Sequence, residues 1–353
     1  MIEILEGILP YIKGLWTLPW ILIGFIVTIL LSRAFGEEKI NRLMKKIGLI
    51  LLYFFVPLLL FKILLGVDFK YNEISFTIAC FAILILMYIL AYFYAKINAK
   101  KMDLKGEIKG NYIITVLTNQ GRSSAFVGGF MLAIDEWRVY ATLYMIIGAI
   151  FLFAIIPAIL SFIHNKNLKN SEKSLKIHAL PGYLKIFPWY LLCFAFAAII
   201  LHGFTGITPK DFGNPGVVFD FITALTIPAA LYYVGAGIHI KDIKDMINRL
   251  KKKQTDKESQ QNWIWTKNIF FLTVVLTSIL TIIVVGLLLG LNLISKEWFV
   301  VITINSILPI TSTNMFLVPY GINKKVTALS VTWTTIVCVP FVVLLITVFK
   351  IFL

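Results

Sequence analysis

The chain has 353 residues, of which 59% are hydrophobic and 14% charged, and its mean hydropathy is +0.87. A soluble globular domain is about 45–50% apolar and about 25% charged, so this composition excludes a soluble protein and indicates a polytopic membrane protein. The formal net charge of +15 does not require a nucleic acid partner, because Lys and Arg are concentrated in short loops between apolar runs, as membrane topology demands. Residues 1–15 lack a basic n-region, so we expect no cleavable signal peptide.

Apolar runs of about 20 residues, the length that crosses a bilayer, occur ten times along the chain. They predict an all-α polytopic membrane protein with transmembrane helices near residues 16–34, 46–65, 73–95, 111–134, 139–161, 186–206, 217–239, 267–291, 297–319 and 326–349. The loop at 162–185 divides the ten helices five and five, so the second half begins on the opposite side of the membrane. Any repeat between the halves is therefore inverted, as in many secondary transporters.

The distribution of basic residues predicts the orientation. Of the 33 Lys and Arg residues, 25 lie in or beside the odd-numbered loops and 5 in or beside the even-numbered loops, while the termini hold two and Arg122 is the last. Basic loops stay in the cytoplasm, so we expect a multi-pass protein of the cell membrane with both termini outside. The polar loop at 241–266 is interpreted as a solvated cytoplasmic linker, with a regulatory domain as the alternative.

Two of the ten runs are interrupted by polar residues and helix breakers. The fourth contains TNQGRSSAFVGG at 118–129 and the ninth contains NSILPITSTNMFLVP at 305–319. Non-helical backbone at membrane depth is tolerated only inside protein or beside a water-filled cavity, and paired interruptions in two halves point to a transporter's substrate site. The second and seventh runs each contain one proline. The predicted helix breaks and hinges are Gly121, Pro309, Pro57 and Pro228.

Arg122 is the residue of this region that most needs a partner. Its guanidinium keeps its charge and presents a planar fork of donors that suits a carboxylate. No Asp or Glu lies in the core of any run, so a ligand anion is the partner we expect. The alternative is a structural role, in which Arg122 donates to carbonyls freed by the helix break. The predicted substrate-binding residues are Asn119, Gln120, Arg122, Ser123, Ser124, Thr311, Ser312, Thr313 and Asn314.

Half-helix N-termini at the two breaks would add N–H groups with partial positive charge. Asp220 is placed by the pattern in the first turn of the seventh helix, where it is expected to complement the helix dipole. A coupling site for a proton or cation is the alternative for this residue. The sequence offers no nucleophile–base pair and no metal-ligand set in the bilayer core, so we expect neither an enzyme nor a bound cofactor.

Several short motifs resemble the auxin efflux carrier family, which includes PIN-type auxin exporters and proteins described as malonate carriers. LPITSTN at 308–314, followed by PYG at 319–321, resembles the family's Pro-Ala-Ala-Thr-Asn stretch and its downstream Tyr-Gly. NQG at 119–121 resembles the Asn-x-Gly opening of its fourth-helix crossover. Pro57 and the segment Ile227–Gly237 resemble the proline regions of its second and seventh helices.

The resemblance extends over essentially the whole chain and implies the fold of the bile-acid–sodium symporters. That fold is a 5+5 inverted repeat of ten helices, in which broken helices 4 and 9 cross at the substrate site. It also implies a homodimer and an elevator-like motion that carries carboxylate anions. The implied domains are a scaffold (1–66 and 186–240), a transport domain (67–161 and 267–353) and cytoplasmic loops (162–185 and 241–266).

The chain departs from the family pattern at two positions. Phe126 stands where the family's fourth helix has a proline, and Arg122 replaces a residue that is usually apolar. A fixed positive charge in the site suggests a more anionic ligand than auxin, such as a dicarboxylate. We therefore expect a secondary active carrier of a small organic anion, with sodium or a proton open as coupling ion. A sodium-coupled symporter of the bile-acid-carrier type and a membrane ligand sensor are the alternatives.

Overall fold

A computed structural model describes residues 2–13, 17–66, 70–124, 127–160, 182–237, 257–314, 317 and 321–352. In this part of the chain the regular structure is helical and no strand is formed. Five helical runs are long and apolar enough to cross a membrane, and two shorter helices are also apolar; the five are Glu37–Leu64, Tyr71–Lys101, Pro209–Tyr233, Gln260–Gly290 and Lys324–Ile351. The prediction of an all-helical, membrane-type protein is thus confirmed. The ten-helix inverted repeat stays a prediction.

The chain divides into two compact units. The first comprises Met1–Phe76, Ala125–Ile146 and Trp189–Ile240. Its helices, some of which begin or end in the other unit, are α1 (Ile2–Lys13), α2 (Thr17–Phe35), α3 (Glu37–Ile50), the π-turn η1 (Leu51–Phe55), α4 (Val56–Leu64), the 3-10 helix η2 (Val127–Ala133), α7 (Asp135–Ile150), α9 (Gly182–Thr205), the 3-10 helix η4 (Pro209–Phe212), α10 (Gly213–Ala224) and α11 (Thr226–Ala236).

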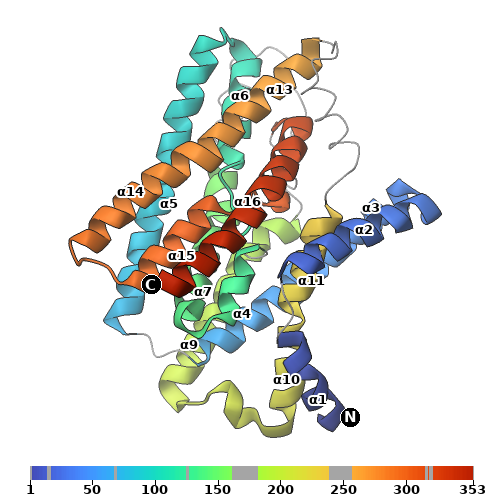
Figure 1. Cartoon of the computed structure of the whole chain (residues 1–353), viewed down its shortest axis with the longest axis vertical. Helices are drawn as coiled ribbons and strands as arrows, with labels where there is room; N and C mark the ends of the chain where they lie inside the picture. Colours follow the sequence, from blue (N-terminus) through green and yellow to red (C-terminus); the bar gives the residue numbers. More distant parts are fainter. Residues whose placement is uncertain are drawn as a thin grey trace. The chain divides into compact units, whose positions relative to one another are not determined.

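The second unit comprises Thr77–Ser124, Ile147–Pro188 and Lys241–Leu353. Its helices are α5 (Tyr71–Lys101), α6 (Gly106–Thr118), the π-turn η3 (Phe151–Ile155), α13 (Lys257–Phe270), the π-turn η5 (Phe271–Leu276), α14 (Thr277–Gly290), α15 (Lys296–Ile307) and α16 (Lys324–Phe352). Helices α13 and α14 form one long rod through η5 (Figure 1).

In the first unit, α2 and α11 lie side by side at very short range (Figure 1). A Cβ on Gly24 of α2 would lie 2.1 Å from the Tyr232 carbonyl oxygen, and a Cβ on Gly235 of α11 would lie 1.9 Å from that of Ile21. Lipid offers no hydrophobic driving force for the association of membrane helices, so they associate through close packing. Small residues at the contact allow the two backbones to approach closely. The two glycines are therefore required by this helix pair.

Pro57 shapes the α3–η1–α4 rod of the same unit. Proline has no N–H, so the Tyr53 carbonyl, four residues earlier, lacks its α-helical donor. The Tyr190 hydroxyl of α9 donates to this carbonyl at 2.9 Å. The proline is accommodated within the helix because a neighbouring side chain satisfies the main-chain group that it exposes.

The core of the second unit is built on a stripe of small residues. Ala91, Ala95 and Ala99 recur at every fourth position of α5 and are fully buried. They pack in one cluster with Tyr112 of α6 and Trp265 of α13. The small side chains on α5 leave room for these large aromatic ones.

The predicted boundaries differ from the observed ones at several places. The first helix, α1, was not predicted as an element, and α13 begins at Lys257, although the predicted loop ran to residue 266. The seventh predicted helix is divided at Leu225 into α10 and α11, and Pro228 lies one turn beyond this division. Most of the two long predicted loops, residues 162–181 and 241–256, lies outside the described part of the chain.

The predicted scaffold segments lie mostly in the first unit, which also contains Ala125–Ile146. The scaffold and transport roles remain predictions.

Candidate functional site

The two interrupted helices end close together in the second unit. α6 ends at Thr118 and α15 ends at Ile307. The extended residues that follow pair as a short antiparallel bridge between Arg122 and Ile310. The Ser123 N–H donates to the Pro309 carbonyl at 2.8 Å, and the Thr311 N–H donates to the Gly121 carbonyl at 3.0 Å. Each break thus satisfies main-chain groups of the other, as non-helical backbone inside a membrane protein requires. We call this paired region, residues 119–124 and 308–314, the crossover.

Arg122 is 8% exposed, and its guanidinium is directed at main-chain carbonyls. Its Nη2 donates to the Thr273 carbonyl at 2.7 Å and its Nη1 to the Leu308 carbonyl at 3.4 Å. The first carbonyl is made available by η5, because the Thr277 N–H donates to Leu272, five residues back, instead of to Thr273. These contacts are the ones expected for a structural Arg122. The expected contact between this guanidinium and a ligand anion stays a prediction.

The three carboxamide side chains of the crossover have buried polar atoms without hydrogen-bond partners among the described residues. Asn119 donates to the Thr115 carbonyl at 2.8 Å and to Thr327 Oγ1 at 3.2 Å, and Gln120 Oε1 accepts from Thr277 Oγ1 at 3.4 Å. Asn119 Oδ1, Gln120 Nε2 and both polar atoms of Asn314 have no hydrogen-bond partner among the described residues. Asn119 and Asn314 are fully buried and Gln120 is 2% exposed. Buried polar groups are normally paired, so this cluster suits a polar ligand.

The hydroxyl residues of the crossover are also buried, with one exception. Thr311 and Thr313 share a hydrogen bond between their hydroxyls at 2.9 Å. Ser123 and Ser124 are 3% and 5% exposed, whereas Ser312 is half-buried and its hydroxyl has no hydrogen-bond partner in the described chain. All nine predicted substrate residues therefore belong to one region of the second unit.

The half-helix N-termini expected after the breaks are not seen as α-helices. Residues 125–126, 315–316 and 318–320 lie outside the described chain. The described segments that follow the breaks, η2 and the turn at Ser312–Asn314, have 3-10 geometry. The helix ends that do meet at the crossover are the C-termini of α6 and α15, which carry partial negative charge.

Sequence reasoning missed the hydroxyl side chains that support the crossover from neighbouring helices. Thr334 of α16 accepts the Ile310 N–H at 3.0 Å, and Ser278 of α14 donates to the Ser306 carbonyl at 3.2 Å. Together with Thr273, Thr277 and Thr327 these side chains are buried. The one available signal in the sequence was the number of hydroxyl residues on otherwise apolar helices. That number does not distinguish a hydroxyl that contacts a ligand from one that hydrogen-bonds to a carbonyl of its own helix.

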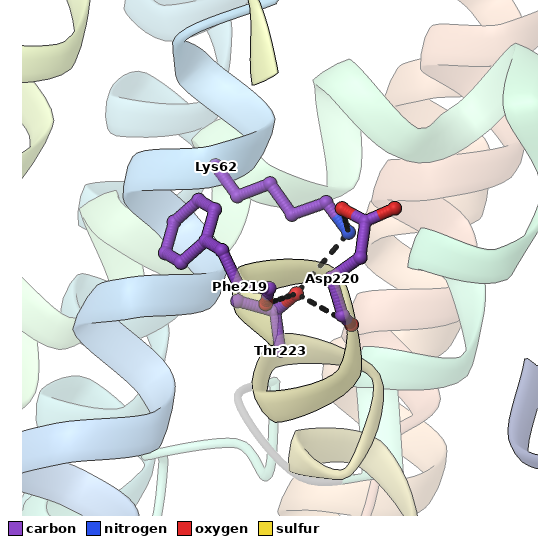
Figure 2. A network of polar contacts seen from close by, with 4 residues as sticks. All are labelled: Lys62, Phe219, Asp220 and Thr223. Carbon is purple, nitrogen blue, oxygen red and sulfur yellow. Dashed lines mark hydrogen bonds and ion pairs between the residues drawn. The ribbon is translucent and has the colours of Figure 1, made fainter. Parts of the chain in front are cut away.

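A second polar cluster lies in the first unit (Figure 2). Lys62 of α4 forms an ion pair with Asp220 of α10 at 2.6 Å and donates to Thr223 Oγ1 at 3.1 Å. Asp220 is the eighth residue of α10, so its expected place in the first turn was wrong. Lys62 was counted with the second loop but lies within α4, 20% exposed. Since the two charges neutralise each other at close range, this cluster is interpreted as structural.

No group of three or more His, Cys, Asp or Glu in the described chain is arranged to hold a metal ion. No protein-family model matches the chain, and a search of curated proteins found no match. The crossover is thus the candidate site on its own geometry.

Proposed function

We propose that this protein is a secondary active transporter that moves a small organic anion, most simply a carboxylate, across the cell membrane. The supporting observation is the crossover itself, where two interrupted apolar helices pair through the Arg122–Ile310 bridge beside buried carboxamides with unpaired polar atoms. Interrupted helices at the centre of a membrane protein are where carriers bind substrate. Polar groups buried without partners are costly to a fold, and binding a ligand would remove that cost.

The residues of the crossover favour an anion over a cation. Four buried carboxamide atoms of the crossover have no hydrogen-bond partner in the described chain. Gln120 Nε2 and Asn314 Nδ2 are donors from which a carboxylate can accept, and Asn119 Oδ1 and Asn314 Oδ1 are acceptors for a hydroxyl of the ligand. Arg122 adds a permanent positive charge in a region of low dielectric, where its field reaches a ligand that it does not touch. In this proposal the carboxamides hold the anion and Arg122 supplies the charge.

The wider architecture belongs to the same proposal. Five long apolar helices and two shorter ones fit a multi-pass membrane protein. We infer a ten-helix 5+5 inverted repeat of the auxin efflux carrier type, with both termini outside, a homodimer, and an elevator-like alternation of access. The support for these is the charge distribution of the loops and the motif resemblance. A sensor that binds the anion without moving it is separated from a carrier by the experiment below.

The test is counterflow of labelled mono- and dicarboxylates into proteoliposomes that contain the purified protein. A carrier exchanges external labelled anion for internal unlabelled anion, whereas a sensor binds without exchange. Asn314→Ala is expected to lower exchange at least tenfold, because its carboxamide is fully buried at the crossover, and losing about 1.4 kcal/mol of binding is a factor of ten. Asn98→Ala is the matched control, since Asn98 donates to the Tyr94 carbonyl within α5 and is not one of the crossover residues. If none of the carboxylates is exchanged, the proposal is refuted.

A further inference from the structure

The Arg122 guanidinium donates to two carbonyl oxygens at places where the regular helical hydrogen bonding changes. One oxygen belongs to Thr273 in the π-turn η5, and the other to Leu308, the C-cap residue of α15. Carbonyls at a helix C-terminus lack helical donors and carry partial negative charge. In transporters with interrupted helices, unwound carbonyls and half-helix C-termini are the groups that bind the coupling cation.

We propose that the Arg122 side chain is a built-in cation, which holds the carbonyl oxygens that an alkali ion would otherwise bind. The carrier then binds its anion without Na⁺ or K⁺. That the protein transports an anion rests on the proposed function, but the effect of cations on its stability can be measured without any substrate.

Sodium does not fit this place while the arginine is present. An ion bound to the Thr273 oxygen would have to contact it directly, and Nη2 already lies 2.7 Å from that oxygen, which leaves no space for an ion between them. Arg122 is 8% exposed, and its guanidinium has no acceptor atoms of its own. It therefore offsets the partial negative charge at the C-terminus of α15 and at the same time excludes a second cation from these two carbonyls.

A tethered cation differs from an exchangeable one in a way that matters for transport. The guanidinium keeps its proton in any protein environment, so the crossover has the same charge whatever the ions on either side of the membrane. The driving force then comes from the electrochemical gradient of the anion, from exchange or from a proton, and not from a gradient of Na⁺ or K⁺. Replacing sodium by choline is expected to leave the thermal midpoint and the anion binding of the wild-type protein unchanged.

The first experiment compares thermal unfolding of the purified wild type and Arg122→Ala in detergent, with no organic anion added. Na⁺, K⁺ and choline are compared at one ionic strength, and methylguanidinium is added at millimolar concentration, well below its denaturing range. A ligand that binds only the folded state raises the thermal midpoint. Once the ligand concentration exceeds the dissociation constant, the rise follows the logarithm of that concentration. We expect a saturable rise of a few degrees for Arg122→Ala with methylguanidinium or an alkali ion, and none for the wild type.

Arg138→Ala is the matched control. Arg138 also donates to a carbonyl, that of Leu132 at 2.8 Å, but it pairs with the Asp135 carboxylate and belongs to the first unit. Its removal should create no cation-dependent midpoint. A folded Arg122→Ala that no cation stabilises, or a wild type with a saturable sodium response, overturns the proposal.

A second comparison applies where Arg122→Ala does not fold. Arg122→Lys retains a cation, whereas Arg122→Met retains length without charge. The lysine variant should melt closer to the wild type than the methionine variant, in choline as in sodium. If lysine is no better than methionine, the carbonyls do not require a cation and the proposal is overturned. Because no anion is present in either comparison, their failure is distinct from a failure of counterflow, which concerns the proposed function.

Discussion

The Asn314 side chain lies directly against the Cα of Gly121, so that a Cβ at position 121 would be 2.8 Å from Asn314 Oδ1. The same Cβ would lie 3.1 Å from Leu152 Cδ1. Asn314 is fully buried, so any displacement of its side chain changes its contacts with buried neighbours. Glycine is required here for contact between the two halves of the crossover.

Gly121→Ala should therefore displace the Asn314 carboxamide. We expect a loss of about 1–3 kcal/mol in stability, the usual effect of adding a methyl group to a filled core. Anion binding should fall further than stability does, because the ligand's contacts change geometry. The measurement is the thermal midpoint of the variant with and without the anion that the counterflow assay identifies.

The control for this substitution is Gly290→Ala at the end of α14. A Cβ there meets no atom within 4 Å, so stability should change by no more than about 0.5 kcal/mol and anion binding not at all. A Gly121→Ala protein that binds the anion as the wild type does would contradict the assigned role of Asn314.

Much of the crossover could be read from the sequence, because its signals are local. Gly121 and Pro309 are helix breakers inside apolar runs, and polar residues beside them are too costly to face lipid. What could not be read is the partner of Arg122. The Thr273 carbonyl is a main-chain group, and it is available only because η5 shifts the helical hydrogen bonds by one residue. No residue type marks such a π-turn.

The ion pair of the first unit escaped prediction for a different reason. Lys62 lies near the end of an apolar run, where a basic residue is ordinarily attributed to the following loop. Its partner, Asp220, is 158 positions later in the sequence, so that only tertiary structure brings the two together. Likewise, α13 extends ten residues into a polar segment that hydropathy assigns to a loop.

The glycines between α2 and α11 predict a strong effect on stability. Gly24→Ala and Gly235→Ala would each place a Cβ within 2.1 Å or less of a carbonyl oxygen on the facing helix. Since the obstacle is backbone, the helices must separate, and we expect each substitution to cost about 3 kcal/mol or more. The yield of monodisperse protein and its thermal midpoint measure this effect.

Gly203→Ala on α9 is the comparison for these two variants, because a Cβ there meets no atom within 4 Å. It should be neutral, or stabilising by roughly 0.5–1 kcal/mol through better helix propensity. Equal midpoints for Gly203→Ala and Gly235→Ala would show that α2 and α11 do not pack at the distance described.

The turn before α10 is closed by the Asp211 side chain. The Asp211 carboxylate accepts from the Thr208 N–H at 2.7 Å and from the Thr208 hydroxyl at 2.8 Å. Asp211→Ala removes both acceptors, so hydrogen exchange at the Thr208 amide, corrected for intrinsic rates, should accelerate. Unchanged exchange in this variant would contradict the role of these bonds.

The Lys62–Asp220 pair predicts a measurable coupling between two helices of the first unit. The side chains are 20% and 31% exposed and their charged atoms are 2.6 Å apart. Removing one partner of a fully buried pair costs about 3–5 kcal/mol, and an exposed pair contributes about 0–1 kcal/mol. We expect an intermediate loss of about 1–3 kcal/mol for Lys62→Met or for Asp220→Asn, and recovery of most of it in the double variant.

A double-mutant cycle on thermal midpoints at pH 7 isolates this coupling. The exposed pair of Lys105 and Asp103 provides the comparison, because its atoms are 3.4 Å apart and its side chains are 82% and 83% exposed. Lys105→Met and Asp103→Asn should be additive within about 0.5 kcal/mol. Additivity at Lys62 and Asp220 as well would mean that the ion pair does not hold α4 to α10. Coupling between Lys62 and Asp220, with none between Lys105 and Asp103, would show that the partly buried ion pair stabilises the first unit without any ligand.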